Sequence, residues 1–326
     1  MPESLILGGA GFVGLHLARR LVRDGHVVTL VDDFSRGRRD AALDELAARP
    51  NVRFVEADLT DRAAFAALPR DADQVYMLAA VVGVRNVEAD PARVVRVNTL
   101  SIMNLLDWLP GRGEVLFFTS TSETYAGGVD AGLVPVPTRE DVPLVIPDIT
   151  APRFAYAASK LLGEAAVVHT ARARGLRYVI GRLHNVYGPR MGADHVIPEL
   201  SLRALKREDP FRLWGADQRR AFCHIDDAVE AIVGLVGADR ACGQIVHIGN
   251  DREEIAIEDL AALVLRVARF APAIDRRPAP AGSVARRCPD ISRLRALTGF
   301  APKIPLESGV RDTFAWYRDH AAGAPA

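Results

Sequence analysis

The sequence predicts an α/β fold in which a doubly wound parallel sheet is followed by a smaller α+β substrate-binding domain. Two observations carry this prediction. Short β-branched runs alternate with helical stretches as far as Leu183, and longer loops follow. The 326 residues suffice for two domains whose cores need neither disulfides nor structural metals. We therefore expect one domain over 1–182 and a second over 183–326.

The elements of the first domain follow from hydrophobic periodicity. Strands alternating with helices in this order indicate a parallel sheet that is covered on both faces. The expected strands are Ser4–Leu7, His26–Val31, Arg53–Glu56, Gln74–Leu78, Val115–Thr119 and Tyr178–Arg182. The expected helices are Phe12–Arg23, a stretch around Ala41–Ala48, Ala92–Leu109 and Tyr156–Arg174.

In the second domain, strands and helices no longer alternate regularly. A buried strand at Gln244–Ile248 is expected to return to the first domain's sheet. The stretch Pro272–Pro289 is rich in Pro, Ala and Arg, which predicts a loop crossing the surface. The expected helices are Ile197–Lys206, Asp227–Val236 and Ile257–Val267.

Composition narrows the class of protein. With 41 basic and 41 acidic residues, the chain lacks the basic excess of a nucleic-acid binder. Cys223, Cys242 and Cys288 are widely spaced, which predicts neither a disulfide framework nor a zinc site and favours the cytoplasm. The amino terminus has no secretory pattern and no run of 18 apolar residues occurs, so we expect no membrane partner.

A glycine cluster, Gly8–Gly14, separates the first strand from the first helix. Glycines at this point permit a tight turn and let backbone N–H groups approach a pyrophosphate at a helix amino terminus. Asp32 ends the second strand, where its carboxylate could accept the ribose hydroxyls of an adenosine. The pattern predicts a Rossmann-like domain that binds NAD. The basic side chains of Arg36, Arg38 and Arg39 leave NADP as an alternative.

Tyr156 and Lys160 share one face of an expected helix because they are four residues apart. A nearby ammonium stabilises a phenolate, and a phenolate can remove a hydroxyl proton while hydride leaves for NAD. The alternative is a surface pair that merely shares a face. The glycine cluster, and the scarcity of lysine outside Lys160, Lys206 and Lys303, favour the catalytic interpretation.

Taken together, these motifs resemble the extended short-chain dehydrogenase/reductase family, whose members modify nucleotide sugars. The resemblance covers nearly the whole chain. It implies a homodimer formed through the helices at Ala92–Leu109 and Tyr156–Arg174. The cofactor-binding residues that it implies are Gly8, Gly11, Phe12, Val13, Gly14, Asp32, Asp33, Ser35, Asp58, Leu59, Ala79, Ala80, Asn98, Tyr156 and Lys160.

The same resemblance implies a site for a nucleotide sugar, with UDP as the expected nucleotide. Thr121 would bond the sugar O4 and assist Tyr156. The implied substrate-binding residues are Asn185, Val196, Arg220 and Arg287. Arg182 and Arg190 are further candidates for binding a diphosphate. No metal is expected, since the scattered His169, His184, His195 and His247 do not form a ligand motif.

Ser122 and Glu123 bear on the reaction. A 4,6-dehydratase usually carries an Asp-Glu pair here, and a serine is too weak an acid for that role. Thr121-Ser122-Glu123 instead resembles the UDP-glucuronate decarboxylases, in which Arg287 matches an arginine near the substrate carboxylate. Oxidative decarboxylation is therefore the leading hypothesis, with catalytic residues Thr121, Ser122, Glu123, Tyr156, Lys160 and Arg287. The alternatives are a 4-epimerase, a 4,6-dehydratase and a non-catalytic NAD-sensing regulator.

Overall fold

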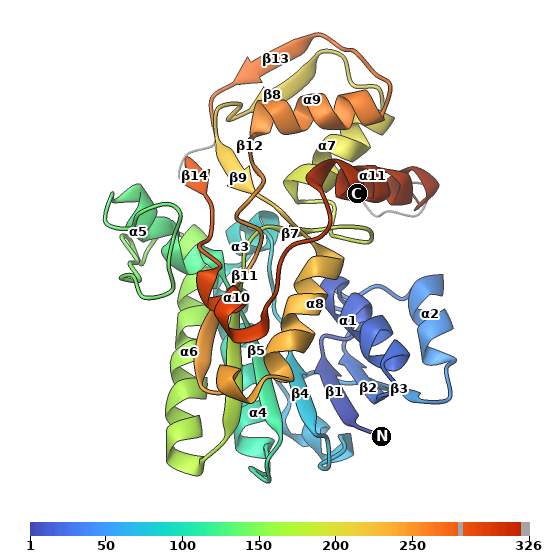
Figure 1. The fold of residues 1–326 in the computed structure, drawn as a ribbon, viewed down its shortest axis with the longest axis vertical. Helices are drawn as coiled ribbons and strands as arrows, with labels where there is room; N and C mark the ends of the chain where they lie inside the picture. The colour runs from blue at the N-terminus through green and yellow to red at the C-terminus, as the bar shows by residue number, and fades with distance from the viewer. Residues whose placement is uncertain (280–282, 321–326) are drawn as a thin grey trace.

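The computed structural model describes residues 1–279 and 283–320. A parallel sheet of seven strands, in the order β11-β6-β5-β4-β1-β2-β3, forms its centre (Figure 1). The strands are β1 (Glu3–Leu7), β2 (Val27–Asp32), β3 (Val52–Glu56), β4 (Gln74–Met77), β5 (Val115–Thr121), β6 (Arg177–Leu183) and β11 (Gln244–Ile248). The predicted α/β fold is confirmed.

Helices cover both faces of this sheet. Side chains alternate along each strand, so in β1 Ile6 belongs to one hydrophobic cluster and Leu5 and Leu7 to the other. The first cluster includes α1 and α8, and the second includes α4 and α6. These helices are α1 (Phe12–Arg23), α4 (Pro91–Trp108), α6 (Arg153–Arg174) and α8 (Ile225–Val236). Shorter helices nearby are α2 (Ala41–Ala47), α3 (Val84–Ala89), α5 (Ala126–Asp130) and α10 (Ser292–Thr298), with 3-10 turns η1 (Arg62–Ala67), η2 (Ser122–Tyr125) and η3 (Asp239–Ala241).

Three small sheets lie beyond the carboxyl ends of the parallel strands (Figure 1). They pair β7 (Val186–Tyr187) with β10 (Cys223–His224), β8 (Phe211–Trp214) with β13 (Ile274–Arg277), and β9 (Arg219–Ala221) with both β12 (Glu254–Ala256) and β14 (Arg286–Arg287). A third hydrophobic cluster joins α7 (Val196–Leu205), α9 (Ile257–Val267) and α11 (Leu306–His320). None of the helices in the described ranges is long and apolar enough to cross a membrane.

The prediction of a surface loop over Pro272–Pro289 is wrong in part. Ile274–Arg277 forms β13 and Arg286–Arg287 forms β14, while Val284 and Cys288 are buried. Both strands pair with segments far away in the chain, and such pairing leaves no local periodicity in the sequence. The proline-rich composition therefore concealed them. Residues 280–282 of this stretch lie outside the described ranges.

Two observations bear on the predicted domains. β6 extends one residue beyond the expected boundary at 182, and β11 lies beside β6 in the same parallel sheet. The chain thus returns to the central sheet from the second half of the sequence. The division into two domains stays a prediction, and its last residues, 321–326, lie outside the described ranges.

Candidate active site

The strand order reverses at β1, which is where a ligand crevice is expected in an open α/β sheet. From β1 the chain proceeds to β2 and β3 on one side, whereas β4, β5 and β6 lie on the other. In open α/β sheets, ligands bind at the carboxyl ends of the strands where the order reverses in this way. The loops that follow β1, β2, β4 and β5 carry the predicted cofactor and catalytic residues.

The glycine turn after β1 fits a pyrophosphate. Gly8 has φ +92°, and a Cβ there would lie 2.7 Å from the Ala79 nitrogen. A Cβ on Gly14 would lie 2.1 Å from the Gly8 carbonyl oxygen. Gly11 precedes α1, and no side chain of the described residues caps this helix start. The first N–H groups of α1, in Phe12, Val13 and Gly14, therefore face a cradle that only glycine can form.

Asp32 is oriented by this turn. Its carboxylate accepts hydrogen bonds from the Ala10 nitrogen at 3.0 Å and the Phe34 nitrogen at 2.9 Å. Burial raises the pKa of Asp32, and these two bonds oppose the rise. The carboxylate is thus held at the carboxyl end of β2, beside the glycine turn. The other predicted cofactor residues of these loops are exposed, namely Asp33, Ser35 and Asp58.

The side chains of Arg36, Arg38 and Arg39, which follow β2, contact different parts of the protein. Arg39 pairs with Glu56 at 2.6 Å, and Arg38 lies 5.6 Å from the centre of the Trp316 ring. Arg36 turns the other way and donates to the Val82 carbonyl in the loop after β4. Within the described residues, they do not gather into the cationic cluster that a 2′-phosphate would require.

Asn98 fixes the loop after β4. Its Oδ1 accepts from the Val81 nitrogen at 2.7 Å, and its Nδ2 donates to the Ser159 hydroxyl at 3.1 Å. Ala79 is tied to β1 by its nitrogen, which donates to the Leu7 carbonyl at 2.8 Å. Asn98 therefore links this loop to α6. Of the other predicted cofactor residues, Ala80 is half-buried in this loop, and Leu59 is buried after β3.

Thr121 and Tyr156 meet at the end of β5. The Thr121 side chain lies close enough to Tyr156 to act on its pKa, and the Thr121 hydroxyl accepts from the Glu123 nitrogen at 3.2 Å. Burial and then the charge of Glu123 raise the pKa of Tyr156, while Thr121 and the charge of Arg36 oppose the rise. This phenol therefore stays protonated in the absence of further positive charge.

Lys160 lies one turn further along α6. Its ammonium donates to the Thr119 carbonyl at 2.8 Å, and burial lowers its pKa to about 8. Across the described residues, no hydrogen bond joins Lys160 to Tyr156 directly. The expected spacing on one helix face is present, but the ammonium is anchored to β5.

Glu123 and Arg287 form an ion pair. Both terminal nitrogens of Arg287 donate to the two carboxylate oxygens of Glu123, the Nη2–Oε2 distance being 2.8 Å. Although burial opposes it, Arg287 holds the pKa of Glu123 below its usual range, and the charges of Arg153 and Arg220 act in the same direction. Glu123 is therefore ionised, and two residues 164 positions apart meet beside Thr121.

Arg220 and Arg287 are neighbours across β9 and β14, where they are register partners. Two like charges in this position repel each other. Burial and then Arg287 lower the pKa of Arg220 to about 10. Its guanidinium donates to the Val284 and Ala285 carbonyls and to the Gln218 side chain. Glu123 balances only one of these two cations, so the pair suits a ligand with more than one negative charge.

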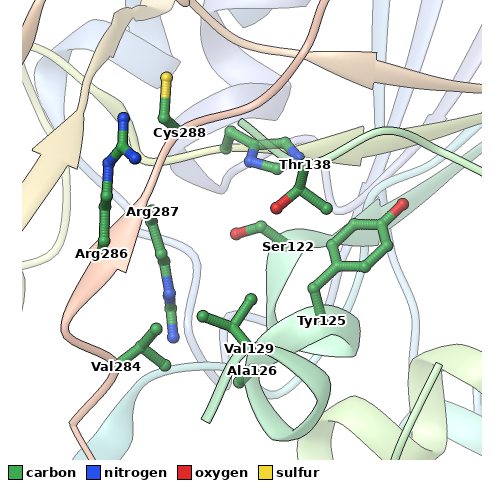
Figure 2. A pocket seen from close by; sticks show the side chains of 10 residues that line it. Ser122, Tyr125, Ala126, Val129, Thr138, Val284, Arg286, Arg287 and Cys288 are labelled. Carbon is green, nitrogen blue, oxygen red and sulfur yellow. The ribbon is translucent and has the colours of Figure 1, made fainter. Parts of the chain in front are cut away.

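A small cavity opens beside this ion pair, and Figure 2 shows Arg287 and Ser122 on its wall. Apolar side chains from α5 and from the segment before β14, Val129 and Val284, line the same space (Figure 2). Ser122, the other predicted catalytic residue of this segment, is buried. The cavity therefore extends from the reactive end of β5 toward β14.

The remaining predicted substrate residues are less directly placed. Asn185 donates through Nδ2 to the Ala221 carbonyl at 2.9 Å. Val196 is the first residue of α7 and packs against the third hydrophobic cluster. Neither contact tests the substrate role that was predicted for these two residues.

The prediction that Arg182 and Arg190 bind a diphosphate is wrong. Arg182 is buried and is bound by both carboxylate oxygens of Glu164, at 2.8 and 2.6 Å. Arg190 is buried and pairs with Asp40 at 2.7 Å, and it also donates to the Ala10 carbonyl at 2.9 Å. Both guanidiniums already have hydrogen-bond partners within the protein, and these bonds connect distant segments of the chain.

A buried histidine pair was missed. The rings of His184 and His247 lie 4.4 Å apart, and His247 Nε2 is 2.7 Å from the Tyr125 hydroxyl. Neither ring nitrogen of His184 has a partner among the described residues. His184 directly follows β6 and His247 lies in β11, so no sequence spacing could have joined them. In the described part of the chain, no cluster of three His, Cys, Asp or Glu side chains could hold a metal.

Comparison with known proteins gives a consistent result. Residues 4–249 match the model of the "NAD dependent epimerase/dehydratase family". The chain is 31% identical to UDP-N-acetyl-alpha-D-glucosaminuronate decarboxylase of Bacillus cytotoxicus, over 97% of this chain and 98% of that protein. It is 30% identical to UDP-glucuronic acid decarboxylase 1 of Xenopus tropicalis, over 96% of this chain and 72% of that protein.

Solved structures of similar fold include UDP-glucose 4-epimerase of Thermotoga maritima with UDP-glucose. It superposes with a TM-score of 0.84 at 27% identity and covers 98% of this chain and 99% of that chain. UDP-glucose 4-epimerase of Thermus thermophilus in complex with NAD has a TM-score of 0.82 at 27% identity, with 97% and 99% covered.

Proposed function

Because the chain belongs to the NAD dependent epimerase/dehydratase family, we propose that it decarboxylates a UDP-uronic acid after transient oxidation at C4. The chain is an NAD-dependent enzyme that acts on nucleotide sugars. The pairing of Arg287 with Glu123 beside Thr121 and Tyr156 carries the more specific proposal. It places a guanidinium that already holds a carboxylate next to the residues that would oxidise C4.

The glycine turn, the start of α1 and Asp32 would hold the cofactor. When bound, NAD supplies the hydride acceptor for C4 and a positive charge beside the phenol. Asp32 would accept the adenosine ribose hydroxyls. Asn98 holds the loop after β4 against α6 through its bonds to Val81 and Ser159.

Tyr156 would remove the proton from the C4 hydroxyl, and Thr121 would orient that hydroxyl. Since burial and Glu123 raise the pKa of Tyr156, the phenol needs compensating positive charge before it can act as a base. Lys160 would supply part of this positive charge through its ammonium, which is held by the Thr119 carbonyl. A group poised in this way contributes roughly 10²–10⁴-fold to a rate.

Arg287 and Glu123 would control the second step. Oxidation at C4 makes the uronic acid a β-keto acid, whose C5–C6 bond breaks because the C4 carbonyl accepts the electron pair. Arg287 would orient the C6 carboxylate, and the ionised Glu123 disfavours a second negative charge nearby. Loss of neutral CO2 relieves that repulsion. C5 then takes up a proton, a step that Ser122 would assist. The hydride that left C4 would return to it, which gives the UDP-pentose.

Arg220 and Arg287 would also serve the nucleotide part of the substrate. Their parallel register gives two adjacent cations against one carboxylate, and a UDP-sugar brings a diphosphate. The relatives at 30–31% identity support a UDP-uronic acid, since both are named as decarboxylases of such sugars. Asn185 and Val196 complete the proposed substrate site.

Incubation with NAD and UDP-glucuronate tests the function. We expect release of CO2 and a UDP-pentose, detected by trapping labelled CO2 and by NMR of the nucleotide sugar. Unchanged substrate would overturn the proposal. A product that keeps its carboxylate with C4 inverted would identify a 4-epimerase, which uses the same Thr121, Tyr156 and Lys160.

Two variants sharpen this test. Glu123→Gln keeps the shape of the side chain but removes its charge, and we expect decarboxylation to fall about 100-fold. Full activity in that variant would favour epimerisation. Tyr156→Phe should abolish all chemistry, and a variant that loses no chemistry would point to a non-catalytic regulator.

The protein is further proposed to be a cytoplasmic homodimeric lyase of two domains, 1–182 and 183–326. Cys223, Cys242 and Cys288 are all free thiols, which suits a reducing compartment. The nucleotide sugar would lie between the central sheet and the small sheets beyond its carboxyl ends. Exposed apolar side chains on α4 and α6 support a dimer through these helices.

A further inference from the structure

Arg36 crosses the cofactor crevice. It lies in the loop after β2, yet its Nη1 donates to the Val82 carbonyl in the loop after β4. Since β2 and β4 flank β1 on opposite sides, the side chain passes over the carboxyl end of β1 and its glycine turn. A Cβ added to Gly83 would lie 3.4 Å from Nη1, and one added to Gly192 would lie 3.8 Å from Nη2.

The charge of Arg36 is not neutralised by a paired carboxylate. In the described ranges it forms no ion pair, and Asp194, the acidic group that acts on it, pairs with Arg85 at 3.2 Å. Arg93 and Tyr156 are the other charged or titratable groups that act on it. A guanidinium offers five N–H donors, and the Val82 carbonyl accepts from only one of its nitrogens, Nη1. Free donors and a free charge therefore lie above the glycine turn.

The pyrophosphate of NAD needs such a group. It brings two negative charges, whereas the start of α1 offers only about half an elementary charge. Asp32 and Asp33 add negative charge on the β2 side. A cation that reaches across the turn would offset this imbalance, and a planar guanidinium can bind phosphate oxygens in pairs.

We propose that Arg36 binds the pyrophosphate of NAD and, by holding the Val82 carbonyl as well, fastens the loop after β2 to the loop after β4 over the bound cofactor. This inference rests on the cofactor of the family and not on the decarboxylation. The two neighbouring arginines are engaged elsewhere, because Arg39 is paired with Glu56 and Arg38 lies over Trp316.

Binding measurements test this role without turnover. Arg36→Ala should weaken NAD binding about tenfold to a hundredfold, the range of a lost charged hydrogen bond, as measured by calorimetry. Arg36→Lys should recover part of the loss, since it keeps the charge but not the planar fork. Arg39→Ala is the matched control, because it removes the same charge from the same loop and should bind NAD as the unmodified protein does.

Three ligands separate this role from others. Loss of Arg36 should weaken NAD, NADP and ADP-ribose equally, and it should leave adenosine binding unchanged. An effect confined to NADP would mean that Arg36 binds a 2′-phosphate, and equal weakening of adenosine would mean that it only shapes the loop. Either result, or a normal affinity for NAD in a folded Arg36→Ala protein, would overturn the proposal.

Discussion

At the scale of single residues, the neighbours of each arginine decide its role. Arg182 is enclosed by Glu164 and Tyr125, and the Ser120 hydroxyl donates to the same carboxylate. Arg287 meets Glu123, which leaves its charge pair at the edge of a cavity. The first arginine is buried inside the protein, whereas the second lines a cavity.

Removing Arg182 should be costly. Arg182→Met leaves the buried Glu164 carboxylate without its partner, and we expect the free energy of unfolding to fall by about 3–5 kcal/mol. Urea denaturation measures this loss. Arg139→Met is the control, since Arg139 and Asp141 form an exposed pair whose removal should hardly change the free energy of unfolding. Similar losses in the two variants would contradict the assignment of Arg182 to the fold.

At the scale of elements, α4 and α6 carry apolar side chains on more than one face. Ile102 and Leu105 of α4 and Val167 of α6 are buried against the sheet. On the outside, Met103 of α4 is 42% exposed and Leu162 of α6 is 49% exposed. Exposed apolar side chains of this size on two adjacent helices are typical of an interface.

Disrupting this surface should dissociate the proposed dimer. Met103→Glu combined with Leu162→Glu places charges on it, and we expect the mass measured by light scattering to fall from dimer to monomer. Leu133→Glu is the control, because Leu133 is 61% exposed but lies outside both helices. A monomeric unmodified protein, or a double variant that remains dimeric, would refute this interface.

At the scale of the whole molecule, the histidine pair connects the two halves of the sequence. His247 lies beside Tyr125, and its backbone nitrogen donates a hydrogen bond to the Glu140 carboxylate at 3.0 Å. Burial lowers the pKa of His247 to about 3, and burial and His247 lower the pKa of His184. Both rings are therefore neutral in the folded protein at neutral pH.

Stability should consequently fall in acid. In the unfolded chain a histidine titrates near pH 6.5, so below this pH the unfolded state binds a proton that folded His247 does not. His247 alone should lower the free energy of unfolding by about 1.4 kcal/mol for each pH unit below 6.5, down to about pH 3. Denaturation at pH 7, 6 and 5 measures the slope, and His247→Gln should flatten it. Equal slopes in the unmodified protein and the variant would show that His247 can be protonated without destabilising the fold.

Local physics made much of the molecule predictable from its sequence. The short apolar run of β1 and the helical spacing of α1 depend on neighbouring residues alone, and both elements lie where expected. The glycine turn was predictable for the same reason, because the positive φ of Gly8 and the close approach of Gly14 to the Gly8 carbonyl arise within a few residues. The spacing of Tyr156 and Lys160 on one helix face belongs to this class too.

Tertiary structure alone decided which charges meet. Glu123 and Arg287 are 164 positions apart, and Arg287 meets Glu123 from β14, a strand that pairs with the distant β9. The same holds for Arg36 over the crevice and for the histidine pair. A guanidinium has the same chemistry wherever it occurs in a sequence, and its role depends on the carboxylates and carbonyls that share its space. Long-range strand pairing decides which groups become neighbours, and it leaves no periodic pattern in the sequence.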